Sequence, residues 1–258
     1  MSEKVKLQGA MTAIVTPFSN GQVDWDALGQ LIDEQIAGGI QGLVPCGTTG
    51  ESPTLSHEEH DQVIEFTVKR VDGRVPVIAG TGSNSTDEAF RLTKKARDAG
   101  ADAALVVNPY YNKPTQEGMY RHMVKLGEAG IPIVLYNIPG RTGIELEPET
   151  IVKMYNEIEM VVAIKEATGQ LDTASAISAE CDITILSGDD SMTLPYGAVG
   201  GKGVVSVVAN LLPAEVRKLT DAMLAGDLAG ARAQHLKLFP LFKGMLSLET
   251  NPIPIKAA

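Results

Sequence analysis

The 258-residue sequence has only two cysteines, Cys46 and Cys181, and one tryptophan, and aromatic residues make up 5% of it. Two cysteines do not form the disulfide framework of a small secreted domain, so we expect a reducing, cytoplasmic location. No apolar stretch is long enough to cross a bilayer, and residues 1–9 contain no apolar signal-peptide core. Basic residues are also scarce, with 22 Lys and Arg against 32 Asp and Glu, a net charge of −10. We therefore expect neither a membrane nor a nucleic-acid partner.

The sequence does contain a regular alternation of short apolar runs and helical patterns. Ser56 and Ser85 are each followed three residues later by a glutamate, which predicts helix N-termini with capping boxes. Gly100 falls where a helix should end and the chain turn back to a strand. The apolar runs predict eight buried strands, at residues 10–16, 42–46, 75–80, 103–108, 131–137, 161–166, 183–188 and 204–209.

Eight strand–helix units over this length predict an α/β fold, a (β/α)8 TIM barrel. The alternative is a doubly wound open sheet, which needs a Gly-rich turn after the first strand, but here that strand leads into Thr16-Pro17-Phe18. We expect residues 1–225 to form the barrel and residues 226–258 to be the remnant of a C-terminal helical region. Because the chain stops at Ala258, we expect this extension to be truncated, with apolar surface exposed on its helix near residues 228–246.

A barrel of this type collects its functional groups at the C-terminal ends of its strands. Five predicted strands end in, or lead into, polar motifs that would meet at one mouth. These motifs are Gly47-Thr48-Thr49-Gly50-Glu51-Ser52, Tyr110-Tyr111-Asn112-Lys113-Pro114, Tyr136-Asn137-Ile138-Pro139-Gly140-Arg141-Thr142-Gly143, Ile164-Lys165-Glu166-Ala167 and Ser187-Gly188-Asp189-Asp190.

Lys165 is the candidate nucleophile, because it lies in the apolar run of residues 161–167. Burial removes the hydration of an ammonium group and favours the neutral amine, which attacks carbonyl carbon to form a Schiff base. The alternative is a lysine at a strand end whose amine reaches water. Tyr136 is the candidate acid/base, since a phenol beside an amine can move protons during carbonyl chemistry. Its alternative role is that of an aromatic residue lining the barrel.

The loop after the second predicted strand suits a carboxylate. Gly47 and Gly50 allow a tight turn and close approach of a ligand, and Thr48 and Thr49 supply hydroxyls and N–H donors. The alternative is a simple turn before a helix. Arg141 is a second candidate, because a guanidinium can bind a carboxylate through two hydrogen bonds, and the alternative for it is a loop ion pair that contributes little stability.

The five motifs occur together and in order, and with them the chain resembles the dihydrodipicolinate synthase family from about residue 7 onward. The wider group is that of pyruvate-dependent class I aldolases of the N-acetylneuraminate lyase type. The resemblance implies condensation of pyruvate with L-aspartate 4-semialdehyde through a Schiff base on Lys165, with no metal or organic cofactor. This reaction is the first committed step of the diaminopimelate route to L-lysine. The double threonine and the arginine loop favour the synthase branch.

The resemblance also implies roles for individual residues. Tyr136 would donate and accept protons in a relay with Thr49 and Tyr111. Tyr111 would enter the site of a neighbouring subunit, so activity would require at least a homodimer, with a homotetramer as the other expected state. Arg141 would position the semialdehyde carboxylate. The full set of implied substrate-binding residues is Thr48, Thr49, Arg141, Gly188 and Val205.

A regulatory site for L-lysine, the end product of the pathway, is implied by the same resemblance. The positions that match it are Ser52, His57, His60, Asn84, Glu88 and Tyr110. His57 and His60 lie three residues apart on one face of a predicted helix, and the alternative for them is a solvated surface. The four histidines show no ligand cluster in the sequence, so no metal is expected.

Three functions remain open at this point. The favoured one is the synthase, with pyruvate and L-aspartate 4-semialdehyde as substrates. The second is another pyruvate aldolase, acting on a sugar acid such as 2-keto-3-deoxygluconate or on N-acetylneuraminate. The third is a non-catalytic sensor on the same barrel, against which Lys165, Tyr136 and Thr49 argue, because a sensor needs no amine, phenol and hydroxyl together.

Overall fold

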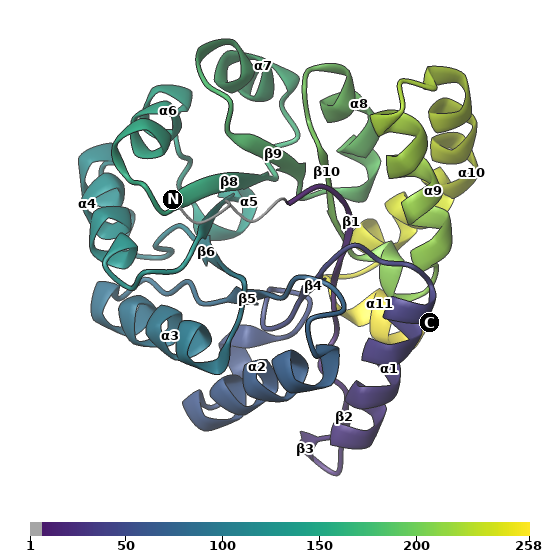
Figure 1. Cartoon of the computed structure of the whole chain (residues 1–258), viewed down its shortest axis with the longest axis horizontal. Helices are drawn as coiled ribbons and strands as arrows, with labels where there is room; N and C mark the ends of the chain where they lie inside the picture. The colour runs from purple at the N-terminus through teal and green to yellow at the C-terminus, as the bar shows by residue number, and fades with distance from the viewer. Residues whose placement is uncertain (1–6) are drawn as a thin grey trace.

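The computed structural model describes residues 7–258, and at its centre a ring of parallel strands is enclosed by helices (Figure 1). Residues 1–6, at the start of the predicted barrel domain, lie outside the described residues. The barrel strands are β1 (Gly9–Ala13), β4 (Leu43–Val44), β5 (Ile78–Gly80), β6 (Ala103–Val107), β7 (Ile133–Asn137), β8 (Val161–Glu166), β9 (Thr184–Ser187) and β10 (Gly203–Ser206).

The outer layer consists of helices that follow the strands in sequence. They are α1 (Trp25–Ala37), α2 (His57–Val71), α3 (Thr86–Ala99), α4 (Gln116–Gly127), α6 (Pro148–Glu157), α7 (Leu171–Glu180), α8 (Thr193–Ala198) and α9 (Pro213–Leu224). Short elements occupy the loops: β2 (Phe18–Ser19), β3 (Gln22–Val23), the one-turn helix α5 (Pro139–Thr142) and the 3-10 helices η1 (Ser52–Thr54), η2 (Asp190–Met192) and η3 (Val208–Asn210). The chain finishes with α10 (Leu228–Ser247) and α11 (Ile253–Ala257).

The strands close into a barrel. Their order is β4-β1-β10-β9-β8-β7-β6-β5, with every neighbouring pair parallel. A parallel bridge between Leu43 and Val77 joins β4 to the segment before β5, and the Leu43 N–H donates to the Pro76 carbonyl at 3.0 Å. A closed ring has no free edges, so the open doubly wound sheet is rejected and the (β/α)8 barrel is confirmed.

Each of the eight predicted runs overlaps one barrel strand, but β1 and β10 each end three residues before the predicted end. The run at residues 10–16 leaves the sheet after Ala13, and the run at residues 204–209 leaves it after Ser206 and continues into η3. Beyond the end of β1, a side chain takes the place of the neighbouring strand as hydrogen-bond partner: the Val15 N–H donates to Asn210 Oδ1 at 3.2 Å. The β2–β3 hairpin, whose side chains are mostly exposed, was not predicted.

The two predicted capping boxes differ in outcome. Ser56 and Glu59 form the complete reciprocal pair at the start of α2, as predicted. At α3 only half of the box forms: Ser85 Oγ accepts from the Glu88 N–H at 3.4 Å. The Glu88 carboxylate turns away from the N-cap and instead accepts from the Ser83 hydroxyl and contacts His57. Gly100 ends α3 with φ of 91°, as expected for a left-handed C-cap.

The apolar residues form a core on both sides of the strands. Inside the barrel, strand residues that point to the axis pack into one cluster, which includes Met11, Ile78, Val134 and Leu186. Two larger clusters fill the space between the outer face of the strands and the helices. Burial on both faces explains why the strands are continuous apolar runs rather than alternating ones.

The C-terminal stretch packs against the barrel. Phe242 of α10 joins the core beneath α9, while Leu228, Leu236 and Phe239 are 63%, 63% and 41% exposed. The predicted apolar surface on this helix is therefore confirmed. Ile255 of α11 packs against Val15 and Val207, near the C-terminal ends of β1 and β10. The division into residues 1–225 and 226–258 remains a prediction.

Candidate active site

Lys165 and Tyr136 are direct neighbours in the barrel wall. They lie opposite each other in the parallel register of β7 and β8. Both side chains are buried, with exposures of 6% and 5%, and Lys165 Nζ lies 4.2 Å from the centre of the Tyr136 ring. A primary amine thus stands over a phenol in an apolar surrounding. The site thus brings together an amine and a phenol, the two groups that Schiff-base carbonyl chemistry uses as nucleophile and proton donor.

Gly188 and Val205 lie beside this pair. A Cβ added to Gly188 would stand 2.6 Å from the Ala167 Cβ and 3.2 Å from the Lys165 Cε, so the absence of a side chain leaves room for the lysine. The Gly188 N–H donates to the Glu166 carbonyl at 2.7 Å. Val205 is 2% exposed and belongs to the same interior cluster as Tyr136. Both predicted pocket positions therefore lie in the barrel interior or against the lysine.

The two threonines have different surroundings. Thr48 lines a cavity of about 300 Å³ together with Tyr136 and Gly47. Thr49 is 3% exposed, and its hydroxyl oxygen accepts a hydrogen bond from Asn251 Nδ2 at 3.0 Å. The loop is held tightly, because a Cβ on Gly50 would lie 2.9 Å from the Cys46 nitrogen. Of the two threonines, only Thr48 lines this cavity with Tyr136.

Asn251 also contacts the loop after β7, which carries Arg141. Its carbonyl accepts from Arg141 Nη2 at 3.1 Å, so the same residue contacts Thr49 and Arg141. Farther along, Lys256 Nζ donates to the Thr16 carbonyl at 2.9 Å and pairs with Glu51. We call residues 251–258 the C-terminal strap. It links the loops after β1, β4 and β7 across the mouth of the barrel.

Asp190 ties the ends of β9 and β10 together next to the lysine pocket. Its carboxylate accepts from the Ser206 hydroxyl and from the N–H groups of Val207 and Val208, the latter two at 2.9 and 3.2 Å. Burial raises the pKa of Asp190 to about 6, although these hydrogen bonds favour the charged form. The motif Ser-Gly-Asp-Asp thus fixes the backbone beside Gly188.

The predicted regulatory residues meet at the same cavity. Every member of the set except Asn84 lines it: Ser52, His57, His60, Glu88 and Tyr110. Asn84 lies outside the lining, and its carbonyl accepts from Asn112 Nδ2 at 3.0 Å. The cavity therefore joins the regulatory positions to Thr48 and Tyr136.

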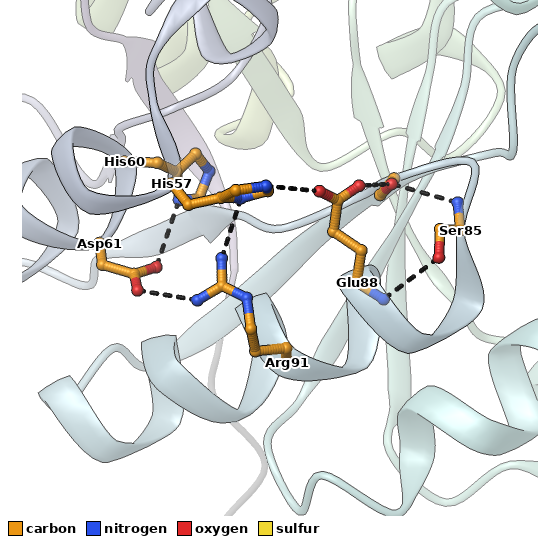
Figure 2. A network of polar contacts seen from close by, with 7 residues as sticks. His57, His60, Asp61, Ser85, Glu88 and Arg91 are labelled. Atoms are coloured by element: carbon orange, nitrogen blue, oxygen red, sulfur yellow. Dashed lines mark hydrogen bonds and ion pairs between the residues drawn. The ribbon is translucent and has the colours of Figure 1, made fainter.

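Polar contacts between α2 and α3 order one side of this cavity (Figure 2). His57 Nε2 lies 3.1 Å from Glu88 Oε1, and Arg91 Nη2 lies 3.2 Å from His57 Nδ1. Because arginine can only donate, Nδ1 is the acceptor and the proton of the neutral ring lies on Nε2, facing Glu88. Arg91 also donates to Asp61 Oδ2 at 2.8 Å. The network presents the Glu88 carboxylate at the cavity.

His60 is the buried polar residue of this pocket. It is 4% exposed, and neither ring nitrogen has a hydrogen-bond partner among the residues that the structure describes. Its Nδ1 lies 3.9 Å from Asp61 Oδ1. Burial lowers the pKa of His60, an effect that the Asp61 charge opposes. The buried His60 imidazole therefore adds a polar group to the lining of the cavity.

Tyr111 does not approach Tyr136 within the chain. Its side chain is 90% exposed, and its φ of 71° is unusual for a residue with a Cβ. Cys46 and Glu51, which flank the threonine loop, also have positive φ, of 53° and 58°. Backbone strain of this kind persists where the surrounding structure enforces it, often at functional sites.

Sequence reasoning missed Asn251 and Ser83. Asn251 is a single polar residue in a Pro-rich end segment, and its contact with Thr49 spans 202 positions. Ser83 lines the cavity and bonds Glu88, but it lies in a Ser/Asn-rich turn with no distinguishing signal. Among residues 7–258, no group of three His, Cys, Asp or Glu side chains is arranged to hold a metal ion. Nor does any described helix have the length and apolarity to cross a membrane.

Comparison with known proteins places the chain among enzymes of one kind. The 4-hydroxy-tetrahydrodipicolinate synthase of Syntrophobacter fumaroxidans is 56% identical over 97% of this chain and 87% of its own length. The dihydrodipicolinate synthase structure from Aquifex aeolicus superimposes with a TM-score of 0.95 at 51% identity, covering 97% of this chain and 86% of that one.

Two further structures of such synthases are known with small molecules bound. The one from Acinetobacter baumannii, in complex with pyruvate, has a TM-score of 0.93 and 43% identity over 98% of this chain and 87% of its own. The one from Cyanidioschyzon merolae, with lysine bound, has a TM-score of 0.94 and 38% identity over 97% and 86%. A sequence model of the dihydrodipicolinate synthetase family matches residues 6–258. The chain therefore belongs to the dihydrodipicolinate synthetase family.

Proposed function

We propose that the protein is a 4-hydroxy-tetrahydrodipicolinate synthase, a class I Schiff-base lyase that condenses pyruvate with L-aspartate 4-semialdehyde. The observation that carries the proposal is the buried Lys165 amine 4.2 Å from the centre of the Tyr136 ring. Family membership supplies the reaction class, and pyruvate, which is bound in one relative, fits a site with an amine, a phenol and carboxylate-binding groups. A sugar-acid aldolase and a non-catalytic sensor are the less supported alternatives.

The first half of the reaction takes place on Lys165. Its amine adds to the keto carbon of pyruvate, a C–N bond forms, and the keto oxygen leaves as water to give the imine. Loss of a proton from the methyl carbon then gives the enamine. Tyr136 is placed to donate and accept these protons, and Thr48 and Thr49 bind the pyruvate carboxylate with Gly188 and Val205 along the pocket wall.

The second half joins the two substrates. The enamine carbon attacks the aldehyde carbon, forming a C–C bond, and the aldehyde oxygen takes up a proton. The amine of the semialdehyde then attacks the imine carbon, which closes the ring and releases Lys165. Arg141 binds the semialdehyde carboxylate, for which its guanidinium is suited. The imine is the electron sink, so no metal or organic cofactor is needed, and we expect activity to survive dialysis against a chelator.

Borohydride trapping tests the Schiff base directly. Incubation with pyruvate and borohydride should add a reduced pyruvyl group to one peptide, the one that contains Lys165. Lys165→Ala should abolish the adduct, and Lys153→Ala, which removes a half-exposed lysine far from the site, should retain it. Folded wild-type protein without an adduct would refute the aldolase class and favour the sensor. Turnover with the semialdehyde but not with sugar acids would then separate the synthase from other aldolases.

We also propose that L-lysine binds in the cavity lined by Ser52, His57, His60, Glu88 and Tyr110 and inhibits the enzyme. The Glu88 carboxylate suits an ammonium group, and the unpartnered His60 ring supplies further polar capacity. A relative with lysine bound supports this choice of ligand. Since the cavity also contains Thr48 and Tyr136, a bound ligand would contact the catalytic loops.

Initial rates at saturating lysine test this regulation. Glu88→Gln should weaken inhibition strongly, because a neutral amide replaces the charge that faces the ligand. Glu58→Gln is the matched control, since Glu58 is exposed on the adjacent helix and does not line the cavity. A wild-type rate that is the same with and without lysine would eliminate the hypothesis. We retain the expectation of a cytoplasmic homodimer or homotetramer.

A further inference from the structure

A pair of buried polar residues stands directly behind the catalytic pair. In the register of β7 and β8, Tyr136 opposes Lys165, and the next pair along is Asn137 opposite Glu166. Successive strand residues point to opposite faces, so Asn137 and Glu166 face away from the barrel interior that holds the amine and the phenol. Both are 0% exposed.

The two side chains bond to each other and to the adjoining loops. Asn137 Nδ2 donates to Glu166 Oε2 at 3.2 Å, and Glu166 Oε1 accepts from the Thr168 N–H at 2.7 Å. Asn137 also holds Leu146 at two points: its Oδ1 accepts from the Leu146 N–H at 3.0 Å, and its Nδ2 donates to the Leu146 carbonyl at 3.2 Å. We call Asn137 and Glu166 the brace. It connects β7, β8 and the segment that follows the Arg141 turn.

The ladder between β7 and β8 is irregular near its start. The pairing of β7 with β8 shifts between Ile133 and Val134, so one residue of β8 is skipped near the start of the strands. A one-residue slip would turn every side chain of a strand to the other face, and Lys165 would leave the interior. At the C-terminal end the β7–β8 ladder is regular, with the Ala167 N–H 2.9 Å from the Asn137 carbonyl, and the bond between the Asn137 and Glu166 side chains adds to it there.

Stability does not explain a carboxyl group at this position. Burial raises the pKa of Glu166, which means that the fold disfavours its charged form despite the bonds from Thr168 and Asn137. A buried charged group generally gives less stability than a well-packed apolar one of similar size. Its placement one residue after Lys165, bonded to the residue after Tyr136, is what a positioning role requires.

We propose that the Asn137–Glu166 brace positions the Lys165 amine against Tyr136 and so sets the rate of Schiff-base formation. Both are positioning residues, because neither faces the substrate. The inference rests on the proposed function, since it concerns the step in which Lys165 attacks pyruvate. Pyruvate binding by Thr48 and Thr49 does not depend on the brace. The brace therefore changes the maximal rate of adduct formation and not the pyruvate concentration that gives half of that rate.

The test is the rate of borohydride-trapped adduct formation as a function of pyruvate concentration. Glu166→Gln keeps the shape of the side chain, but its amide offers one acceptor where Thr168 and Asn137 present two donors, so one bond is lost. We expect the maximal rate to fall about tenfold to a hundredfold, as for a small misplacement of reacting groups, with an unchanged half-saturating pyruvate concentration. Asn137→Ser, whose side chain is too short to reach Glu166, should act in the same way and serves if Glu166→Gln does not fold.

The double variant and a control separate positioning from general destabilisation. If the two residues act as one unit, Asn137→Ser/Glu166→Gln should be no slower than the slower single variant. Gln35→Leu is the control: Gln35 is 2% exposed and bonds Thr12 and the Asn210 carbonyl at 2.6 and 3.1 Å, away from Lys165. It should lower the unfolding temperature but leave the trapping rate unchanged.

The outcomes distinguish this inference from the function on which it rests. A wild type that forms no adduct would overturn the proposed function, and the role of the brace with it. If the wild type forms the adduct and the brace variants form it at maximal rates within about twofold of the wild-type rate, the role of the brace alone is overturned. If the rate losses of the two single variants multiply in the double variant, or if Gln35→Leu loses as much of the maximal rate, the brace contributes only to general stability.

Discussion

Neighbouring residues of the same type have unlike roles in this site, as Thr48 and Thr49 show. The sequence resemblance assigned Thr49 to the proton relay, whereas the structure gives Thr48 a shared cavity with Tyr136 and gives Thr49 a partner in Asn251. Adjacent residues of a tight turn point in different directions, so a motif does not decide which hydroxyl faces the substrate. The assignment is open to a direct comparison of the two hydroxyls.

Removal of each hydroxyl should have a different effect. Thr48→Val should lower kcat about a hundredfold or more, the usual scale for loss of a positioned proton-transfer group. Thr49→Val should raise the KM for pyruvate and destabilise the protein by about 1 to 3 kcal/mol, with little loss of kcat, because Asn251 Nδ2 is left buried without its acceptor. Steady-state rates and urea unfolding measure the two effects. A large kcat loss confined to Thr49→Val would return Thr49 to the relay.

Helix packing at the scale of elements also depends on single polar contacts. Between α3 and α4, the Thr86 hydroxyl lies 2.9 Å from Nδ1 of His122, which is 5% exposed. Burial lowers the pKa of His122 to about 4 from its ordinary value of 6.5. The folded protein therefore holds this ring neutral over a pH range in which the unfolded chain binds a proton.

The sign of the resulting pH dependence follows from proton binding. Between pH 6.5 and about 4 the unfolded state binds more protons at this site, so its contribution to stability is full above pH 6.5 and falls as the pH falls towards 4. The shift corresponds to a loss of about 3 kcal/mol across this range. The unfolding free energy of wild type minus that of His122→Gln should decrease accordingly. A difference that stays constant from pH 7 to pH 4 would contradict the expectation.

Strands and helix ends could be predicted from the sequence where burial or local chemistry dictates the residue type. They could not be predicted where contacts between residues far apart in the sequence decide the structure. The barrel strands are apolar on both faces, so their runs stand out, and Ser56 with Glu59 forms its cap from local chemistry alone. The α3 capping box failed in part because Glu88 is drawn to Ser83 and His57, which belongs to another helix. Asn251 was invisible for the same reason, since its partners lie far away in the sequence.

At the scale of the whole molecule, the exposed Tyr111 is the residue through which we predict that a second chain completes the catalytic site. A tyrosine that is 90% exposed at positive φ has no evident role in its own chain. We predicted that it enters the site of a neighbouring subunit, and this remains a prediction. Such a shared site, formed twice across a twofold axis, can be tested by mixing two defective variants.

Mixed subunits should recover activity. Lys165→Ala and Tyr111→Phe should each be strongly impaired, but a hybrid dimer would contain one site with both an intact Lys165 and an intact Tyr111. Random mixing of equal amounts, after dissociation and reassembly, should restore about a quarter of the wild-type sites. Separately reassembled variants are the control. Activity that stays at the average of the two parents would show that Tyr111 does not act across subunits.

The C-terminal strap makes the last few residues mechanically continuous with the catalytic loops. Asn251 contacts both Thr49 and Arg141, and Lys256 is bonded to the Thr16 carbonyl and to Glu51. A mechanical force applied to the strap would therefore act first on the loops at the mouth of the barrel and only then on the outer helices. The β1 strand begins at Gly9, at the opposite pole of the barrel. A tether attached within residues 251–258 should therefore pull on the parts that bind substrate, whereas one attached near Gly9 should not.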